Sequence, residues 1–209
     1  MQGLVLLPGM GATSAMYAGP WRELEGVRFL DWPDYGGERS VVELAERVLA
    51  EHGLEPGTPV GGTSLGGMVA LELAARLDSP YAVLLSSARS GSEVRPHLRL
   101  LAPLARLVPD VVFRRGATFI AGEAGREADP RFLRAMCPAV VAWPGSSYAG
   151  PVLRVHGARD EVIRVPEPVT PVPGARHIGV LTHPREFLEG LRAELEELGC
   201  RGAPAVELR

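Results

Sequence analysis

Short, continuously apolar runs recur along this chain, and the segments between them carry apolar residues at helical spacing. Such runs are typical of strands that are buried on both faces, as in a parallel sheet. The predicted strands lie at 3–7, 27–32, 59–63, 81–86, 152–157 and 169–172. Because strands alternate with helices, the sequence predicts an α/β fold: a mostly parallel sheet of about six strands with helices on both faces.

Caps and apolar stripes mark the helical segments. Ser40 followed by Glu43 is a capping box, in which each side chain pairs with the backbone of the other residue. Pro184 stands where proline commonly opens a helix. The sequence predicts helices at 21–24, 41–51, 68–77 and 184–198.

Residues 89–150 break the alternation of strands and helices. They contain no good strand, short helical pieces at 98–107 and 131–136, and six prolines. The segment is too long for one crossover connection. We therefore predict a small helical lid at 89–150, inserted into a core of 1–88 and 151–199 and followed by a disordered tail at 200–209. The alternative is ordinary helical packing on the sheet.

The pattern Gly62-x-Ser64-x-Gly66 stands between a predicted strand and a predicted helix. In a nucleophile elbow, a sharp strand-to-helix turn exposes the serine hydroxyl and leaves no room for side chains at the glycines. The same letters also arise by chance in chains rich in glycine, and this one has 25 glycines. The flanking strand and helix favour the elbow.

Composition excludes several classes of function. All 22 basic residues are arginine, and without lysine there is neither a P-loop nor a Schiff-base enzyme. A net charge of −3 gives no reason to expect a nucleic-acid partner. The cysteines and histidines lack the spacing of a metal site. No apolar run has the length of a membrane span and residues 1–20 lack signal-peptide features, so we expect a cytoplasmic protein.

Four separated blocks carry a family resemblance. They are Leu6-Leu7-Pro8-Gly9-Met10-Gly11, the Ser64 elbow, His156-Gly157-Ala158-Arg159-Asp160 and Gly174-Ala175-Arg176-His177. In these blocks, and over nearly its whole length, the chain resembles the α/β-hydrolase family. The order Ser, Asp, His is the one that this fold uses. The chain starts at what resembles the third strand of the family, which implies a minimal version without the first two strands.

The resemblance implies a role for each block. Ser64 would be the nucleophile, His177 its base, and Asp160 the carboxylate that orients the imidazole and stabilises its cation. The backbone N–H groups of Met10 and Leu65 would form the oxyanion hole. Relatives often carry histidine where this chain has Pro8, but a backbone donor does not depend on that side chain.

These roles imply a serine hydrolase that cleaves a small ester through an acyl-enzyme intermediate, without cofactor or metal. Thioesterase, C–C hydrolase, amidase and acyl transferase activities use the same triad and stay open. Arg89 and Arg95 follow a strand end, where ligands tend to bind. They are candidates for binding an acidic substrate group, the alternative being that they face solvent. His156 is assigned a structural role.

Two hypotheses from other classes remain. Gly9-x-Gly11-x-x-Ser14 follows a strand, and Asp31 ends the next one, as in a dinucleotide-binding fingerprint. However, Ser14 replaces the third glycine, and this hypothesis gives Ser64, Asp160 and His177 no role. The other alternative is a hydrolase-like binding module without catalysis.

Overall fold

The computed structural model describes residues 3–125, 128–165 and 167–200. Six parallel strands form one sheet in the order β2-β1-β3-β4-β5-β6. The strands are β1 (Leu4–Leu7), β2 (Val27–Phe29), β3 (Val60–Thr63), β4 (Ala82–Leu85), β5 (Val152–Gly157) and β6 (Thr170–Val172). The predicted fold class is confirmed. Because every pair is parallel, all the carboxyl ends meet at one edge of the sheet.

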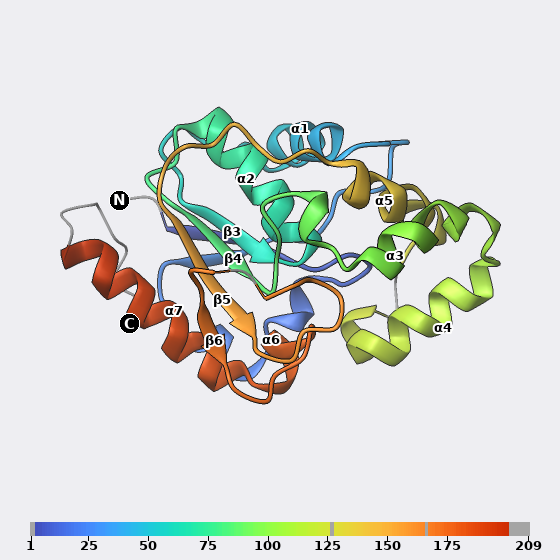
Figure 1. The fold of residues 1–209 in the computed structure, drawn as a ribbon. Helices are drawn as coiled ribbons and strands as arrows, with labels where there is room; N and C mark the ends of the chain where they lie inside the picture. The colour runs from blue at the N-terminus through green and yellow to red at the C-terminus, as the bar shows by residue number, and fades with distance from the viewer. Residues whose placement is uncertain (1–2, 126–127, 166, 201–209) are drawn as a thin grey trace.

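Helices cover both faces of this sheet (Figure 1). The α-helices are α1 (Val41–His52), α2 (Leu65–Leu77), α3 (Pro96–Leu101), α4 (Asp110–Ala121), α5 (Pro130–Ala142), α6 (Gly179–Thr182) and α7 (Pro184–Cys200). Short 3₁₀ helices lie at Ser14–Met16, Gly19–Glu23, Gly91–Glu93, Ala102–Leu107 and Gly122–Gly125. Helices α1 and α2 lie on one face, and α6 and α7 lie on the other (Figure 1).

The alternation of side chains along β1 divides the hydrophobic core into two layers. Val5 and Leu7 pack with α1 and α2, whereas Leu4 and Leu6 pack with α7. All four side chains are buried, as expected for a strand that is covered on both faces. The sheet is thereby fixed between two helical layers, and it provides a rigid base for the loops at its carboxyl edge.

Capping side chains set the start of α1 where the sequence predicted it. The Ser40 hydroxyl accepts a hydrogen bond from the Glu43 N–H at 3.1 Å. The Glu43 carboxylate accepts in turn from the N–H of Arg39 at 2.7 Å, one residue further back than in a standard capping box. Gly53, with φ +56°, ends the helix in the left-handed conformation that glycine tolerates.

The segment 89–150 has two parts with different packing. Helix α3 has no buried residue. In contrast, α5 buries Phe132, Leu133 and Met136 in the same core layer as α1 and α2. After α5, the indole N–H of Trp143 donates to the Glu72 carboxylate on α2 at 2.8 Å. The second part is therefore anchored to the core, and the boundary of a separate lid stays a prediction.

Several predicted elements differ in extent from the observed ones. The strand predicted at 27–32 ends at Phe29, and beyond it the Trp32 indole N–H donates to the Gly9 carbonyl in the loop after β1. The helix predicted at 21–24 is 3₁₀ helix. Helix α4 was not predicted, since its Val111-Val112-Phe113 start favours a strand and Gly116 weakens a helix.

At the carboxyl end, α7 continues to Cys200, which the sequence analysis had placed in the tail. Residues 201–209 lie outside the described part of the chain. None of the helices in the described ranges has the length and apolarity that a membrane crossing needs.

Candidate active site

Ser64 lies at the tip of the turn between β3 and α2, in a strained conformation. Its φ of 53° and ψ of −118° fall in a region that residues with a side chain rarely adopt. Two hydrogen bonds to the backbone of Ser64 hold this geometry. Its N–H donates to the Leu85 carbonyl at 3.1 Å, and its carbonyl accepts from the Ser87 hydroxyl at 2.6 Å. The neighbouring strand thus keeps the serine where the elbow pattern predicts it.

Gly62 and Gly66, which flank Ser64, leave no room for a side chain. A Cβ at Gly62 would lie 2.5 Å from the carbonyl carbon of Gly66, and one at Gly66 would collide with the Pro8 carbonyl oxygen. The loop that follows β1, which we call the first loop, therefore runs directly against the start of α2. This close approach brings the Gly9-Met10 segment beside the Ser64 side chain, since a Cβ at Gly9 would meet the Ser64 Cβ at 3.9 Å.

Asp160 follows β5 and is fully buried. Its Oδ1 accepts the backbone N–H groups of Val162 at 2.7 Å and Ile163 at 2.8 Å. Its carbonyl oxygen accepts two hydrogen bonds from the Arg95 guanidinium, at 3.2 Å from Nε and 2.6 Å from an η nitrogen. The carboxylate is thus fixed through one oxygen and through its own backbone, which leaves Oδ2 free to face the neighbouring loop.

His177 joins Asp160 to Ser64. Its Nδ1 lies 2.8 Å from Oδ2 of Asp160, and its Nε2 lies 3.0 Å from the Ser64 hydroxyl oxygen. With the proton on Nδ1, that nitrogen donates to the carboxylate and Nε2 accepts from the hydroxyl. The three residues come from three loops at the carboxyl edge of the sheet, and the structure brings them together as the sequence predicted.

A second imidazole faces the same carboxylate. Burial alone would raise the pKa of Asp160, but contacts with His156, His177 and the Ile163 N–H outweigh it and hold the pKa well below its usual range. Nε2 of His156 lies 2.9 Å from Oδ2, although the two groups are not aligned well enough for a hydrogen bond. Asp160 is therefore ionised at neutral pH.

Two hydrogen bonds fix the Gly9–Met10 peptide in the first loop. The Gly9 carbonyl accepts from the Trp32 indole N–H at 3.0 Å and from the Ala12 N–H at 3.1 Å. Because a trans peptide is planar, fixing that carbonyl also directs the N–H of Met10 the opposite way. Leu65 starts α2, where the first N–H groups have no partner within the helix.

An apolar cavity of about 620 Å³ opens onto Ser64 and His177. This volume lies within the range of pockets that bind small molecules. Residues 89–150 contribute half of the residues that line it, and the other half come from the first loop, the Ser64 turn and the loops that follow β5 and β6. Residues that line it include Met10, Val94, Leu98, Leu104, Val140 and Leu181.

A family model described as the alpha/beta hydrolase family matches residues 4–190. The chain belongs to the alpha/beta hydrolase family. No curated protein sequence matches it significantly.

Solved structures of this family have the same fold at low sequence identity. A thermophilic esterase from Thermogutta terrifontis is 18% identical with a TM-score of 0.71, and the match covers 95% of this chain and 90% of that one. The enol-lactonase from Burkholderia xenovorans LB400 is 16% identical with a TM-score of 0.69, covering 94% and 92%. The RedJ thioesterase from Streptomyces coelicolor is 22% identical with a TM-score of 0.61, covering 90% and 89%.

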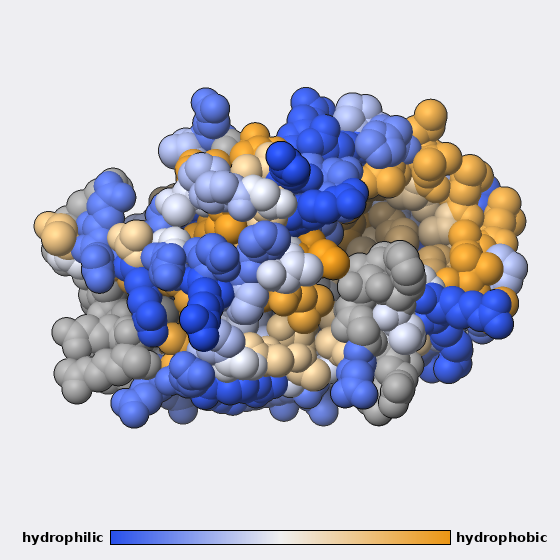
Figure 2. Space-filling view, turned by 90° about the horizontal axis from the view of Figure 1, so that it is seen from below, coloured by the Kyte–Doolittle hydropathy of each residue, from blue (hydrophilic) through white to orange (hydrophobic). Residues whose placement is uncertain are grey.

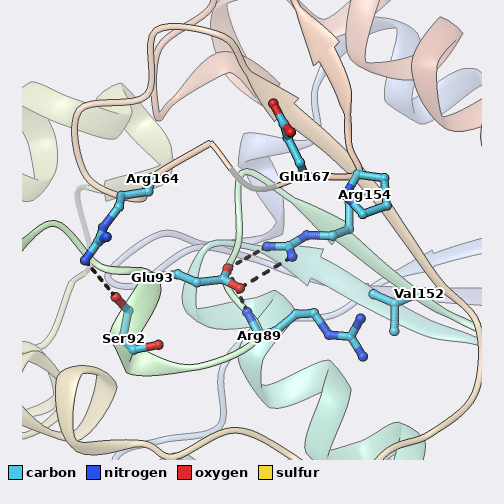
Figure 3. A pocket seen from close by; sticks show the side chains of 8 residues that line it. Arg89, Ser92, Glu93, Val152, Arg154, Arg164 and Glu167 are labelled. Atoms are coloured by element: carbon cyan, nitrogen blue, oxygen red, sulfur yellow. Dashed lines mark hydrogen bonds and ion pairs between the residues drawn. The ribbon is translucent and has the colours of Figure 1, made fainter.

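The two arginines that were candidates for substrate binding lie elsewhere in this alpha/beta hydrolase. Arg95 holds the Asp160 carbonyl and does not line the cavity above Ser64. Arg89 lies in a separate polar pocket of about 450 Å³ that shares no lining residue with that cavity (Figure 3). There Glu93 accepts from the Arg89 backbone N–H at 3.1 Å and pairs with Arg154 at 2.6 Å. Substrate binding by either arginine stays a prediction.

Three contacts of this site were missed by sequence reasoning. His156 was assigned a structural role, yet it touches the carboxylate oxygen that His177 uses. The hydrogen bond from Arg95 to the Asp160 carbonyl joins residues that are 65 positions apart. The hydrogen bond from Trp32 to the Gly9 carbonyl joins residues that are 23 positions apart. The only local signal for any of them is the spacing of His156 and Asp160, four positions apart across one turn.

Proposed function

We propose that the protein is a serine hydrolase that cleaves a small ester through an acyl-enzyme intermediate on Ser64. The observation that carries the proposal is the continuous chain of contacts from Asp160 through His177 to Ser64, at 2.8 and 3.0 Å. A serine hydroxyl is a weak nucleophile until a base removes its proton, and here the base lies within reach of that proton.

The reaction follows from this geometry. The Ser64 oxygen attacks the ester carbonyl carbon while Nε2 of His177 takes the hydroxyl proton. The ionised Asp160 stabilises the imidazolium that forms. Collapse of the tetrahedral intermediate breaks the bond to the alcohol, which leaves with the proton from His177. Water then attacks the acyl-enzyme by the same route and releases the acid.

The charge that develops on the carbonyl oxygen needs donors that are already in place. We assign this role to the N–H groups of Met10 and Leu65. Support comes from the Trp32 contact that orients the Gly9–Met10 peptide and from the position of Leu65 at the start of α2. Both donors are backbone groups, so the assignment does not depend on either side chain.

The cavity favours a small-molecule substrate whose acyl group is aliphatic. Its walls are mainly leucine, valine, alanine and methionine, and no arginine, aspartate or glutamate of the described residues lines it. A thioesterase is the second candidate, because the same triad accepts either acyl donor and a thioesterase is among the similar structures. The other activities of this triad, on amides and C–C bonds and in acyl transfer, have no observation that favours them.

A panel of p-nitrophenyl esters and acyl thioesters of graded chain length tests the proposal. We expect hydrolysis of esters with a kcat/KM that rises with acyl length until the cavity is filled. Faster turnover of thioesters at matched acyl length would select the second candidate. No hydrolysis of any member by a folded protein would contradict both.

A further inference from the structure

The lid carries an exposed apolar surface that no described segment covers. Its large side chains are strongly exposed, with 79% of Leu100 and 72% of Leu107 accessible to solvent. Figure 2 shows hydrophobic residues gathered at the end of the molecule that carries α3 and α4, beside a hollow in the surface. We call this surface the lid patch, and its residues are Leu100, Leu101, Leu104, Leu107, Val111 and Val112.

The lid patch continues into the cavity above Ser64. Leu101 and Leu104 are about half exposed at the surface, and both also line the cavity. An apolar molecule could therefore move from the patch to the serine without crossing a polar barrier. Solvent-exposed leucines at a cavity mouth are costly in water, and contiguous apolar patches mark interaction sites.

The charge around the lid patch is opposite in sign to that of the whole protein. Residues 95–115 contain five arginines and one aspartate, and hence carry a formal charge of +4, whereas the chain carries −3. Arg99, Arg106, Arg114 and Arg115 are exposed, and none forms an ion pair with a carboxylate in the described ranges. The patch is thus a basic rim around an aliphatic centre.

We propose that the lid patch docks on an anionic lipid surface, from which a lipophilic ester enters the cavity. Leucines bury in the acyl boundary while arginines meet anionic headgroups, as in interfacial helices. A second copy of this chain fits less well, because a two-fold interface would place the arginines against one another. A protein partner fits less well too, because the patch has none of the aromatic anchors that dominate such interfaces.

Docking rests on the proposed function and names the source of its substrate. Docking can nevertheless fail while the proposed function stands. The full chain with Ser64→Ala is used for binding, so that no lipid is hydrolysed. It is sedimented with phosphatidylglycerol vesicles and with phosphatidylcholine vesicles. We expect at least about tenfold stronger partitioning to the anionic vesicles, and a loss of binding as salt is raised.

Matched variants locate the surface. Leu100→Gln with Leu107→Gln should lower partitioning about tenfold or more. Arg99→Gln with Arg106→Gln should lower it roughly fivefold for each arginine removed. Val111→Gln should also weaken partitioning to the anionic vesicles. Val42→Gln, at an exposed valine of α1, should leave this partitioning unchanged. With Ser64 intact, Leu100→Gln with Leu107→Gln should hydrolyse a water-soluble acetyl ester at the wild-type rate, because neither leucine lines the cavity.

Three results would overturn docking. They are equal partitioning to both kinds of vesicle, binding that survives Leu100→Gln with Leu107→Gln, and lipid-free dimerisation that those substitutions abolish. The last result would assign the lid patch to a second copy of the chain. If the soluble ester is hydrolysed but vesicles are not bound, docking fails and the proposed function stands. If vesicles are bound but no ester is hydrolysed, the proposed function fails.

Discussion

His156 lies against the carboxylate of Asp160, with its Nε2 2.9 Å from Oδ2. That oxygen is the one that His177 contacts at 2.8 Å, so two imidazoles share one acceptor. His156 is 1% exposed and its ring cannot move away without opening the core. We interpret it as a positioning residue that keeps Oδ2 turned toward His177 and adds to the interactions that keep Asp160 ionised.

Replacing His156 should therefore weaken catalysis without removing any reacting group. We expect His156→Leu to lower kcat/KM about tenfold, which corresponds to losing about 1.4 kcal/mol of transition-state stabilisation, with KM little changed. His156→Gln keeps an N–H near Oδ2 and should recover much of the loss. Steady-state kinetics on the two variants, with melting curves as a folding control, decide the matter. Wild-type kcat in His156→Leu would show that the contact only fills space.

Asp160 should also make stability depend on pH in the acid range. Its pKa is depressed in the folded state, so its contribution is present above the unfolded value of about 3.9 and is lost as pH falls through the lower folded value. The free energy of unfolding should thus fall below about pH 4, and Asp160→Asn should flatten that part of the curve. Denaturant unfolding from pH 5 to 2 measures this, with Asp34→Asn in an exposed loop as the control. Equal slopes for all three proteins would contradict the claim.

The two histidines near the end of the chain should behave differently. His177→Ala removes the proposed base and should lower turnover by several orders of magnitude, as loss of a triad base does elsewhere. His183 contacts the Thr182 hydroxyl at 2.8 Å, and its carbonyl accepts from the first turn of α7. His183→Ala should leave turnover near wild type and cost roughly 1 kcal/mol of stability or less. Single-mutant kinetics test the ranking, and the reverse order would reassign the base.

The two parts of 89–150 should differ in their local stability. Helix α3 has no buried residue, whereas α5 buries six side chains in the core, namely Pro130, Phe132, Leu133, Met136, Ala139 and Val140. Backbone amides in α3 and in the exposed start of α4 should therefore exchange hydrogen faster than those of α5 and of the central strands. Hydrogen exchange read by mass spectrometry tests this. Protection of α3 equal to that of α5 would mean that 89–150 is one integral layer.

Local patterns predicted the strands and the elbow because each has a cause within a few residues, whereas Asp160 and His177 were assigned through the resemblance to the α/β-hydrolase family. Burial on both faces shows in β1 as a continuous apolar run, and the Ser64 turn shows in its two glycines. Contacts between distant segments left no such signal. The contact of Trp32 with Gly9 crosses 23 positions, and α4 formed from residues that favour a strand when taken alone. The motifs therefore indicated which residues form the site, but not which other side chains hold those residues in position.

The central claim is that Ser64 is the group that attacks the substrate, and covalent labelling tests it most directly. A serine-directed fluorophosphonate is incubated with the wild-type protein, with His177→Ala and with Ser64→Ala, and the adduct is located by peptide mass spectrometry. We predict one adduct on Ser64 in the wild-type protein, much slower labelling of His177→Ala, and neither labelling nor ester hydrolysis in a folded Ser64→Ala protein. An adduct on another residue, or ester hydrolysis that survives Ser64→Ala, would contradict the account.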